Sequence, residues 1–199
     1  MSLWSVIAKR ALGNIFNGNE SAAVKKNTQA LLDRVAAMDD ASLIREAIGD
    51  LSASEIKELA RGVLRLRAEE ALEILRACDS CRELLSSGGY DPVHLLETLS
   101  NSIGAKSAQM DIDASGRGGS QRDQGYDTRI RFGPREFLTG TSLDGMTVRE
   151  SQLQVILHEL AHAAGDVIPP DGNNPDESQR NQQRITRACL PDVYERINH

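Results

Sequence analysis

Aromatic residues are scarce in this chain, at 4% of 199 residues, and acidic residues outnumber basic ones by 29 to 23. Surfaces that bind nucleic acids use basic side chains for the phosphates and aromatic rings for the bases. This chain has a net charge of −6 and a pI of about 5.3, so it has no excess of basic side chains, and it has few aromatic rings. The composition therefore argues against nucleic acid, and against an anionic membrane surface, as a partner.

The chain also lacks an apolar run long enough to span a membrane. Its first apolar stretch, Leu3 to Ala8, is followed at once by Lys9 and Arg10, so no signal peptide is visible. On the sequence alone we expect a cytoplasmic protein without an integral membrane segment. Export by another route stays open, because small peptidases with similar motifs are often exported.

Cysteines are few and odd in number: Cys78, Cys81 and Cys189. Cys78 and Cys81 form a C-x-x-C pattern, but no second pair completes a structural zinc site and no strand precedes it as in thioredoxins. We expect these two residues to be small buried side chains of a helical region. The alternative is a disulfide from Cys78 or Cys81 to Cys189, if the protein meets an oxidising compartment.

The most informative pattern that is present is the pentad His158-Glu159-Leu160-Ala161-His162, which contains two of the chain's four histidines. Residues four apart lie on one face of a helix, so both imidazoles can bind one metal ion. Glu159 lies beside the first histidine, where a carboxylate can take a proton from a metal-activated water. Without a metal, two histidines this close would repel each other when protonated. We therefore interpret His158 and His162 as zinc ligands and Glu159 as a general base.

The helix that carries the pentad can be bounded from the sequence. Thr147 and Glu150 form a capping box at its start. Gly165 is typical of a helix end, and Pro169-Pro170 prevent the helix from continuing. The pattern places Gln154 on the wetter side of the helix, with the histidines at the border. An apolar stripe at three-to-four spacing faces the core, with the members Leu153, Ile156, Leu157, Leu160 and Ala164.

A third ligand must come from the residues after the pentad, because catalytic zinc takes three protein ligands and leaves one position for water. The metzincin pattern would place it at position 168, where this chain has Ile168, so that family is excluded. Asp176 and Glu177 are explained as first-turn acids of a helix opened by Asn174-Pro175. Asp171, in a Pro-Pro-Asp-Gly turn, is the best candidate, although turn aspartates are also common without a metal. Glu177 is the fallback.

The sequence H-E-L-A-H, followed by an aspartate nine residues after the second histidine, resembles the aspzincin (deuterolysin-like) branch of zinc metallopeptidases. The resemblance implies that His158, His162 and Asp171 are zinc ligands and that Glu159 is the general base. It covers about residues 128–190, and the pentad is its specific part. Aspzincins carry G-T-x-D-x-x-Y-G around the aspartate, but Asn174 stands here in place of the tyrosine that steadies the oxyanion. Residues 178–189 also resemble the tail of small bacterial proteins with the pattern H-E-L-x-H…D…S-x-x-N…C.

These patterns predict a zinc-dependent metallopeptidase that cleaves a peptide or protein substrate, with Zn²⁺ as its cofactor. Arg180, Asn181 and Tyr194 are candidates for supporting the oxyanion, because all three follow Asp171 in the chain. The alternative is a catalytically inactive, zincin-like metal-binding scaffold or interaction protein. The missing aspzincin tyrosine is the feature that keeps this alternative open.

We expect an α+β fold that is predominantly α, with a zincin-like metallopeptidase domain over residues 81–199 and a helical N-terminal region over residues 1–80. That region could have a regulatory, targeting or pro-like role, or bind a protein partner. The alternating residues Thr128–Phe132 predict an edge strand beside the zinc helix, where a peptide could add a strand, and Gln109–Asp113 could pair with it. The expected N-terminal helices are Leu3–Phe16, Ser21–Met38, Ala41–Ile48 and a long helix from a capping box at Ser52 and Glu55 towards Cys78.

Overall fold

The computed structural model describes residues 30, 32–33, 35–113, 120–140, 142–165, 167–171 and 174–199, with the backbone alone described at 120–122. The expected helix Leu3–Phe16 and much of Ser21–Met38 lie outside these residues. The described part is predominantly helical with one small sheet, as expected for this α+β chain. Its elements are α3 (Ala41–Ile48), α4 (Ala53–Ala77), α5 (Asp79–Ser86), α6 (Pro92–Ser100), β1 (Met110–Ile112), β2 (Ser120–Arg122), η1 (Gly125–Asp127), β3 (Arg129–Phe132), α7 (Pro134–Thr139), α8 (Val148–Ala163), α9 (Pro175–Cys189) and α10 (Pro191–Asn198).

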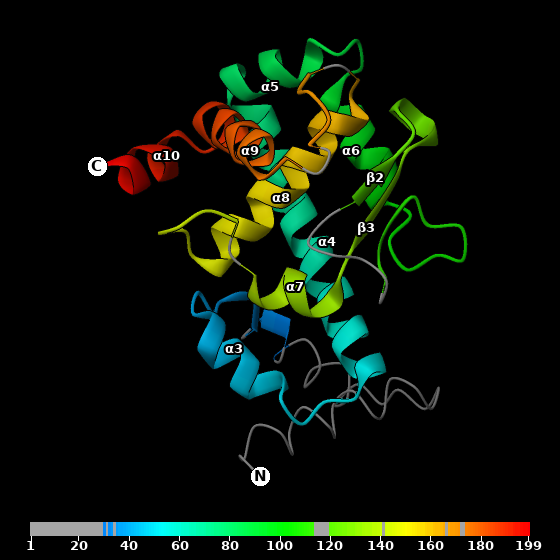
Figure 1. Ribbon diagram of the computed structural model, residues 1–199. Helices are drawn as coiled ribbons and strands as arrows, with labels where there is room; N and C mark the ends of the chain where they lie inside the picture. Colours follow the sequence, from blue (N-terminus) through cyan, green and yellow to red (C-terminus); the bar gives the residue numbers. More distant parts are fainter. Residues whose placement is uncertain are drawn as a thin grey trace.

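The long helix α4 runs through the middle of the molecule and packs against α8, α6, α7 and β1 (Figure 1). It begins at the expected capping box, in which the Ser52 side chain accepts from the Glu55 N–H and the Glu55 side chain reaches back. One buried cluster draws on residues from Val35 to Leu190. Helix α4 therefore supports the pentad helix α8. It is also joined to β1, because Arg61 of α4 pairs with Asp111, Nη2 to Oδ2 at 2.6 Å. A separate role for residues 1–80 stays a prediction.

The sheet has three strands in the order β1-β3-β2, with β1 parallel and β2 antiparallel to β3. The predicted pairing of Gln109–Asp113 with Thr128–Phe132 is confirmed, with Met110 opposite Ile130. The prediction that Thr128–Phe132 is an edge strand is wrong, because β3 is the central strand and pairs with β1 at one edge and β2 at the other. The strand that lies at the edge and contacts α8 is β2. Its Ser-Gln-Arg sequence has no alternation of apolar residues, so the pattern did not reveal it.

Helix α8 begins and ends where the sequence predicted. Thr147 accepts from the Glu150 N–H at 3.2 Å and Glu150 returns a bond to the Thr147 N–H at 2.9 Å. At the other end Gly165 has a φ of +108°, a conformation in which a residue with a side chain would be strained. A Cβ on Gly165 would also meet the Gly88 carbonyl oxygen at 2.5 Å, and one on Gly88 would meet the Ala164 oxygen at 2.0 Å. The loop after α5 therefore lies directly against the end of the pentad helix.

A disulfide joins Cys81 of α5 to Cys189 at the end of α9. The expectation that the cysteines of the C-x-x-C pattern are simply small buried residues is wrong for Cys81, and the alternative pairing with Cys189 is the one observed. Cys78 is free and half-buried, with its Sγ 3.3 Å from the Ala188 carbonyl oxygen. Disulfides are rare in the reducing cytosol. This bond therefore argues against the expected cytoplasmic location, which stays a prediction.

Within the described residues, every helix is too short or too polar to cross a lipid bilayer.

Candidate metal centre and cleft

The structure brings His158, His162 and Asp171 together. One turn of α8 separates the two histidines, whose Nε2 atoms lie 3.2 Å apart. Asp171 approaches from the loop before α9, with its Oδ2 atom 2.8 Å from His158 Nε2 and its Oδ1 atom 3.7 Å from His162 Nε2. Among the described residues, this is the group whose histidine, cysteine and carboxylate atoms are placed to share a metal ion. Glu177 is not a member of it, although it lies in the first turn of α9 as expected.

The spacing of these atoms fits a zinc ion. Zinc is bound tetrahedrally at about 2.0–2.2 Å from imidazole nitrogen or carboxylate oxygen, which puts neighbouring ligand atoms about 3.3 Å apart. The three separations, 3.2, 2.8 and 3.7 Å, lie on both sides of that value. Two imidazoles and one carboxylate are also a donor set that leaves a fourth position open. The residues present therefore suit a zinc ion with one position for water or substrate.

Helix α9 holds the Asp171 carboxylate in place. The Asn181 Nδ2 group donates to Asp171 Oδ1 at 2.7 Å and to the Pro169 carbonyl oxygen at 2.8 Å. Ser178 donates to Asp171 Oδ2 over a longer 3.3 Å. Partial burial alone would raise the pKa of Asp171, but the hydrogen bonds from His158 and Asn181 outweigh it and hold this pKa well below its usual range. The carboxylate is therefore charged, as a metal ligand must be.

The surroundings of His162 favour its neutral form. Burial lowers the pKa of His162, and the neighbouring His158 lowers it further, while Asp171 opposes both. A neutral imidazole has a free lone pair, which is the form that binds a metal. His162 is therefore in the form that can bind a cation.

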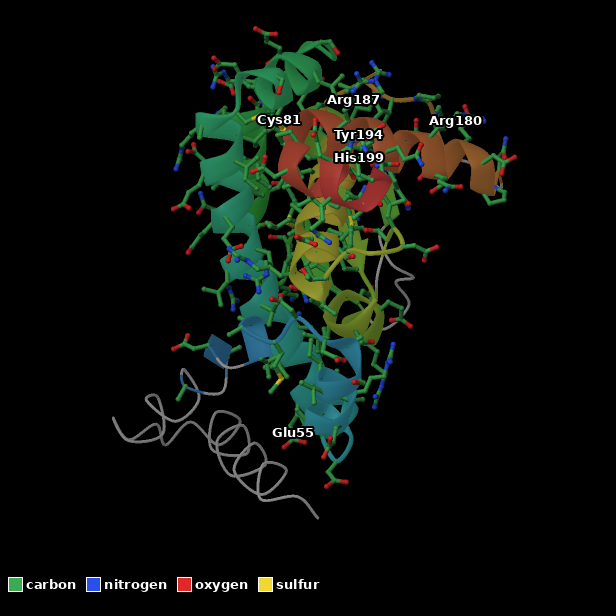
Figure 2. All side chains as sticks on the ribbon, turned by 90° about the vertical axis from the view of Figure 1, so that its left-hand side faces the viewer. Glu55, Cys81, Arg180, Arg187, Tyr194 and His199 are labelled. Atoms are coloured by element: carbon green, nitrogen blue, oxygen red, sulfur yellow. A yellow bond between two sulfur atoms is a disulfide. The ribbon has the colours of Figure 1, made fainter. Side chains whose placement is uncertain are left out.

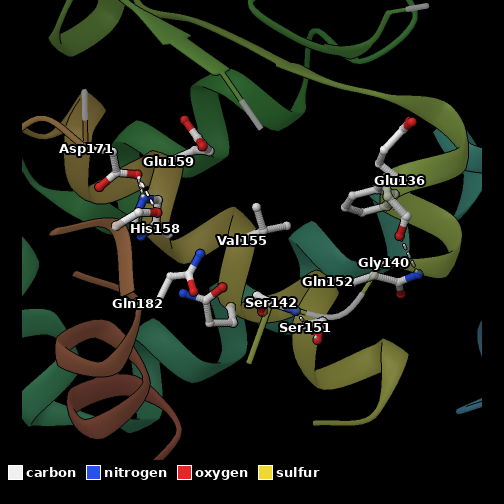
Figure 3. A pocket seen from close by; sticks show the side chains of 13 residues that line it. Glu136, Gly140, Ser142, Ser151, Gln152, Val155, His158, Glu159, Asp171 and Gln182 are labelled. Carbon is white, nitrogen blue, oxygen red and sulfur yellow. Dashed lines mark hydrogen bonds and ion pairs between the residues drawn. The ribbon is translucent and has the colours of Figure 1, made fainter. Parts of the chain in front are cut away.

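Glu159 lies beside the metal group on the wall of a cavity of about 420 Å³, and its side chain is only 6% exposed. Burial raises the pKa of Glu159 to about 7, against the influence of His158 and with that of Asp171. A carboxyl group with a pKa near neutrality can both accept and return a proton. Figure 3 shows its carboxyl group next to the His158–Asp171 pair and facing the cavity.

The cavity lies between α7, α8 and the start of α9, so the metal group is at one end of a cleft rather than in a closed core (Figure 3). Val155 and Phe137 provide apolar surface, and most of the remaining wall is polar. The lining residues are Glu136, Phe137, Gly140, Ser142, Ser151, Gln152, Gln154, Val155, His158, Glu159, Asp171, Ser178 and Gln182. A molecule in this cavity would contact His158, Asp171 and Glu159 together.

The three candidates for oxyanion support are not among the described residues that line the cavity. Asn181 binds Asp171, as described above. Arg180 is exposed on α9, and Tyr194 on α10 stacks with Arg187, whose guanidinium carbon lies 6.0 Å from the ring centre. Figure 2 shows Tyr194 and Arg187 on the same side of the molecule. Neither Arg180 nor Tyr194 is among the described residues that line the cavity.

The expectation that Gln154 lies on the wetter side of α8 is wrong. Its side chain is fully buried, with 0% of its surface exposed, although it lines the cavity wall. Neither atom of its amide group has a hydrogen-bond partner among the described residues, and the same holds for His158 Nδ1. The polarity of this helix face predicts a solvated surface, but the surrounding structure leaves no part of Gln154 exposed.

No protein-family model matches the chain, and neither the curated proteins nor the solved structures gave a significant match.

Proposed function

We propose that this chain is a zinc-dependent metallopeptidase of the zincin type, with His158, His162 and Asp171 as the metal ligands and Glu159 as the general base. The observation that carries the proposal is the meeting of these four side chains at one end of a cleft. The pentad lies on one element, and Asp171 comes from a separate loop that α9 fixes in place.

His158, His162 and Asp171 would hold a zinc ion, which would supply polarisation of the scissile carbonyl and a lower pKa, towards about 7, for a water molecule. Glu159 takes the proton of the attacking water and returns it to the leaving amine, which is the role that a carboxyl group with a pKa near neutrality can perform. Asn181 keeps Asp171 oriented and charged throughout. The polar wall of the cleft orients the peptide, and the strand β2, which contacts α8, is the edge to which an extended substrate can add.

The test combines metal analysis with a hydrolysis assay. We expect about one zinc per chain in the purified protein, and cleavage of a fluorescently labelled unstructured protein such as casein. Glu159→Gln should abolish cleavage and leave the zinc bound, because an amide cannot take up the proton. Glu83→Gln, on the exposed surface of α5, is the matched control and should cleave like the parent. A zinc-free parent protein, or a fully active Glu159→Gln variant, would refute the proposal.

The second candidate is a zincin-like scaffold that binds zinc without turnover. Its support is that Arg180 and Tyr194 lie outside the cavity lining and that Asn174 replaces the aspzincin tyrosine. Zinc removal would then lower the melting temperature, while no peptide in a randomised mixture would be cut. Mass spectrometry of such a mixture after incubation distinguishes the two candidates.

A further inference from the structure

Three buried polar atoms lack a hydrogen-bond partner among the described residues, and all three belong to one face of α8. They are the two amide atoms of Gln154 and the Nδ1 atom of His158. Gln154 and His158 are four residues apart, so their side chains lie one turn from each other. Leaving a buried polar group unpaired destabilises the folded state, so such groups in a native protein call for an explanation.

The other buried glutamine of α8 shows that unpaired amides are not general on this helix. Gln152 accepts from Arg67 Nε at 2.9 Å and donates to the Phe137 carbonyl oxygen at 3.0 Å. Both of its amide atoms are therefore used to hold α8 against α4 and α7. Gln154, two residues later and equally buried, has no such structural role.

The chemistry of a metal-bound imidazole supplies a role. When His158 Nε2 gives its lone pair to a metal ion, the ring proton must be on Nδ1, which then needs an acceptor. Helical side chains point back towards the N-terminus, so the ring of His158 extends over the turn that bears Gln154. The Oε1 atom of Gln154 is a buried acceptor without a donor among the described residues, and His158 Nδ1, which carries the ring proton when Nε2 binds a metal, is buried there without a partner.

We propose that Gln154 is a positioning residue of the metal centre: its Oε1 atom accepts a hydrogen bond from His158 Nδ1–H when the centre is loaded. This bond fixes the tautomer of His158 that leaves Nε2 free for the metal, and it orients the ring. The inference rests on the proposed metal site and is independent of whether peptide bonds are cleaved.

The test is zinc affinity measured by competition with a fluorescent chelator. Gln154→Leu has nearly the same shape but no acceptor, and should weaken zinc binding 10- to 100-fold. Its metal-free form should be as stable to urea as the parent or more so, because the variant no longer buries an unpaired amide. Gln152→Leu is the matched control: it should lose stability, because it breaks the contacts with Arg67 and Phe137, and keep the zinc affinity within about threefold.

An NMR measurement adds a readout that a merely structural role would not change. With ¹⁵N-labelled histidine, the zinc-loaded parent should show a slowly exchanging His158 Nδ1 proton, and Gln154→Leu should lose that protection. If the parent binds zinc and Gln154→Leu binds it equally well, the inference is overturned while the metal site stands. If the parent binds no zinc, both fail. Zinc binding that weakens in Gln154→Leu supports the inference even where no hydrolysis is found.

Discussion

Asn181→Leu should weaken zinc binding by about 10- to 100-fold, although it replaces none of the proposed ligands. In the parent, Asn181 Nδ2 donates to Asp171 Oδ1 at 2.7 Å and to the Pro169 carbonyl oxygen at 2.8 Å, and the side chain is 3% exposed. Leucine fills a similar volume but donates neither bond. In the metal-free variant the carboxylate of Asp171 keeps only its contacts with His158 and Ser178, and zinc binding must bear more of the cost of ordering it.

The two hydrogen bonds of Asn181 contribute to different quantities, the zinc affinity and the stability of the fold. The bond to Asp171 orders a proposed ligand before the metal binds, and loss of such an outer partner typically costs about 10- to 100-fold in metal affinity. The bond to Pro169 is present with or without the metal, so its loss lowers the stability of both forms, by about 1–3 kcal/mol. Ser178 reaches Asp171 over 3.3 Å, a long bond for a hydroxyl donor. Ser178→Ala should therefore cost less than about threefold in affinity.

The assay is a chelator competition at a temperature where circular dichroism shows both variants folded. The expected order of zinc affinity is parent, then Ser178→Ala, then Asn181→Leu. Equal affinities for the parent and Asn181→Leu would refute the argument that Asn181 orders the third ligand. A larger loss in Ser178→Ala than in Asn181→Leu would show that the shorter bond is not the stronger one.

The two remaining predictions concern the disulfide between α5 and α9 and the Gly88 loop that follows α5. The Cys81–Cys189 disulfide closes a loop of sequence separation 108, so Cys81→Ala/Cys189→Ala should lower the unfolding free energy by up to about 5 kcal/mol, while Cys78→Ala should stay close to the parent in urea. Thiol titration of the unreduced, unfolded protein that finds all three thiols reactive would contradict the pairing. Gly88→Ala would place a Cβ 2.0 Å from the Ala164 carbonyl oxygen and should cost about 3 kcal/mol. Gly89→Ala meets nothing within 4 Å and should cost only the strain of its φ of +97°, about 1–2 kcal/mol; equal losses in urea would disprove the close approach.

Local patterns predicted the pentad helix because every signal for it is within one or two turns. The bounds of α8 follow from Thr147, Glu150 and Gly165, and the spacing of His158 and His162 follows from the helix period. Likewise the capping box before α4 and the proline at the start of α9 fixed where those helices begin. These contacts are made by neighbours in the chain, so a single sequence contains them.

The supports of the site depend on contacts between distant residues, which a single sequence does not show. Asn181 was one of several polar candidates for a different role, and nothing near it in the chain indicates that its amide reaches Asp171. Gln154 looked solvated because the helix period says which face is polar but not which elements cover it. The strand β2 was missed because its three residues are all polar and its pairing with β3 decides its conformation.

Helix α9 connects the disulfide with Asp171, the proposed third ligand, which gives this helix a larger part in the candidate site than the pentad suggests. Its first half holds Asp171 through Asn181, and its last residue, Cys189, is bonded to Cys81 of α5. The loop that follows α5 contains Gly88, which lies against the end of α8 just beyond His162. Helix α5 is thus linked to α8 through the Gly88 loop and to α9 through the disulfide. We therefore expect a displacement of α5 to shift both α8, which bears the two histidines, and α9, which holds Asp171 through Asn181.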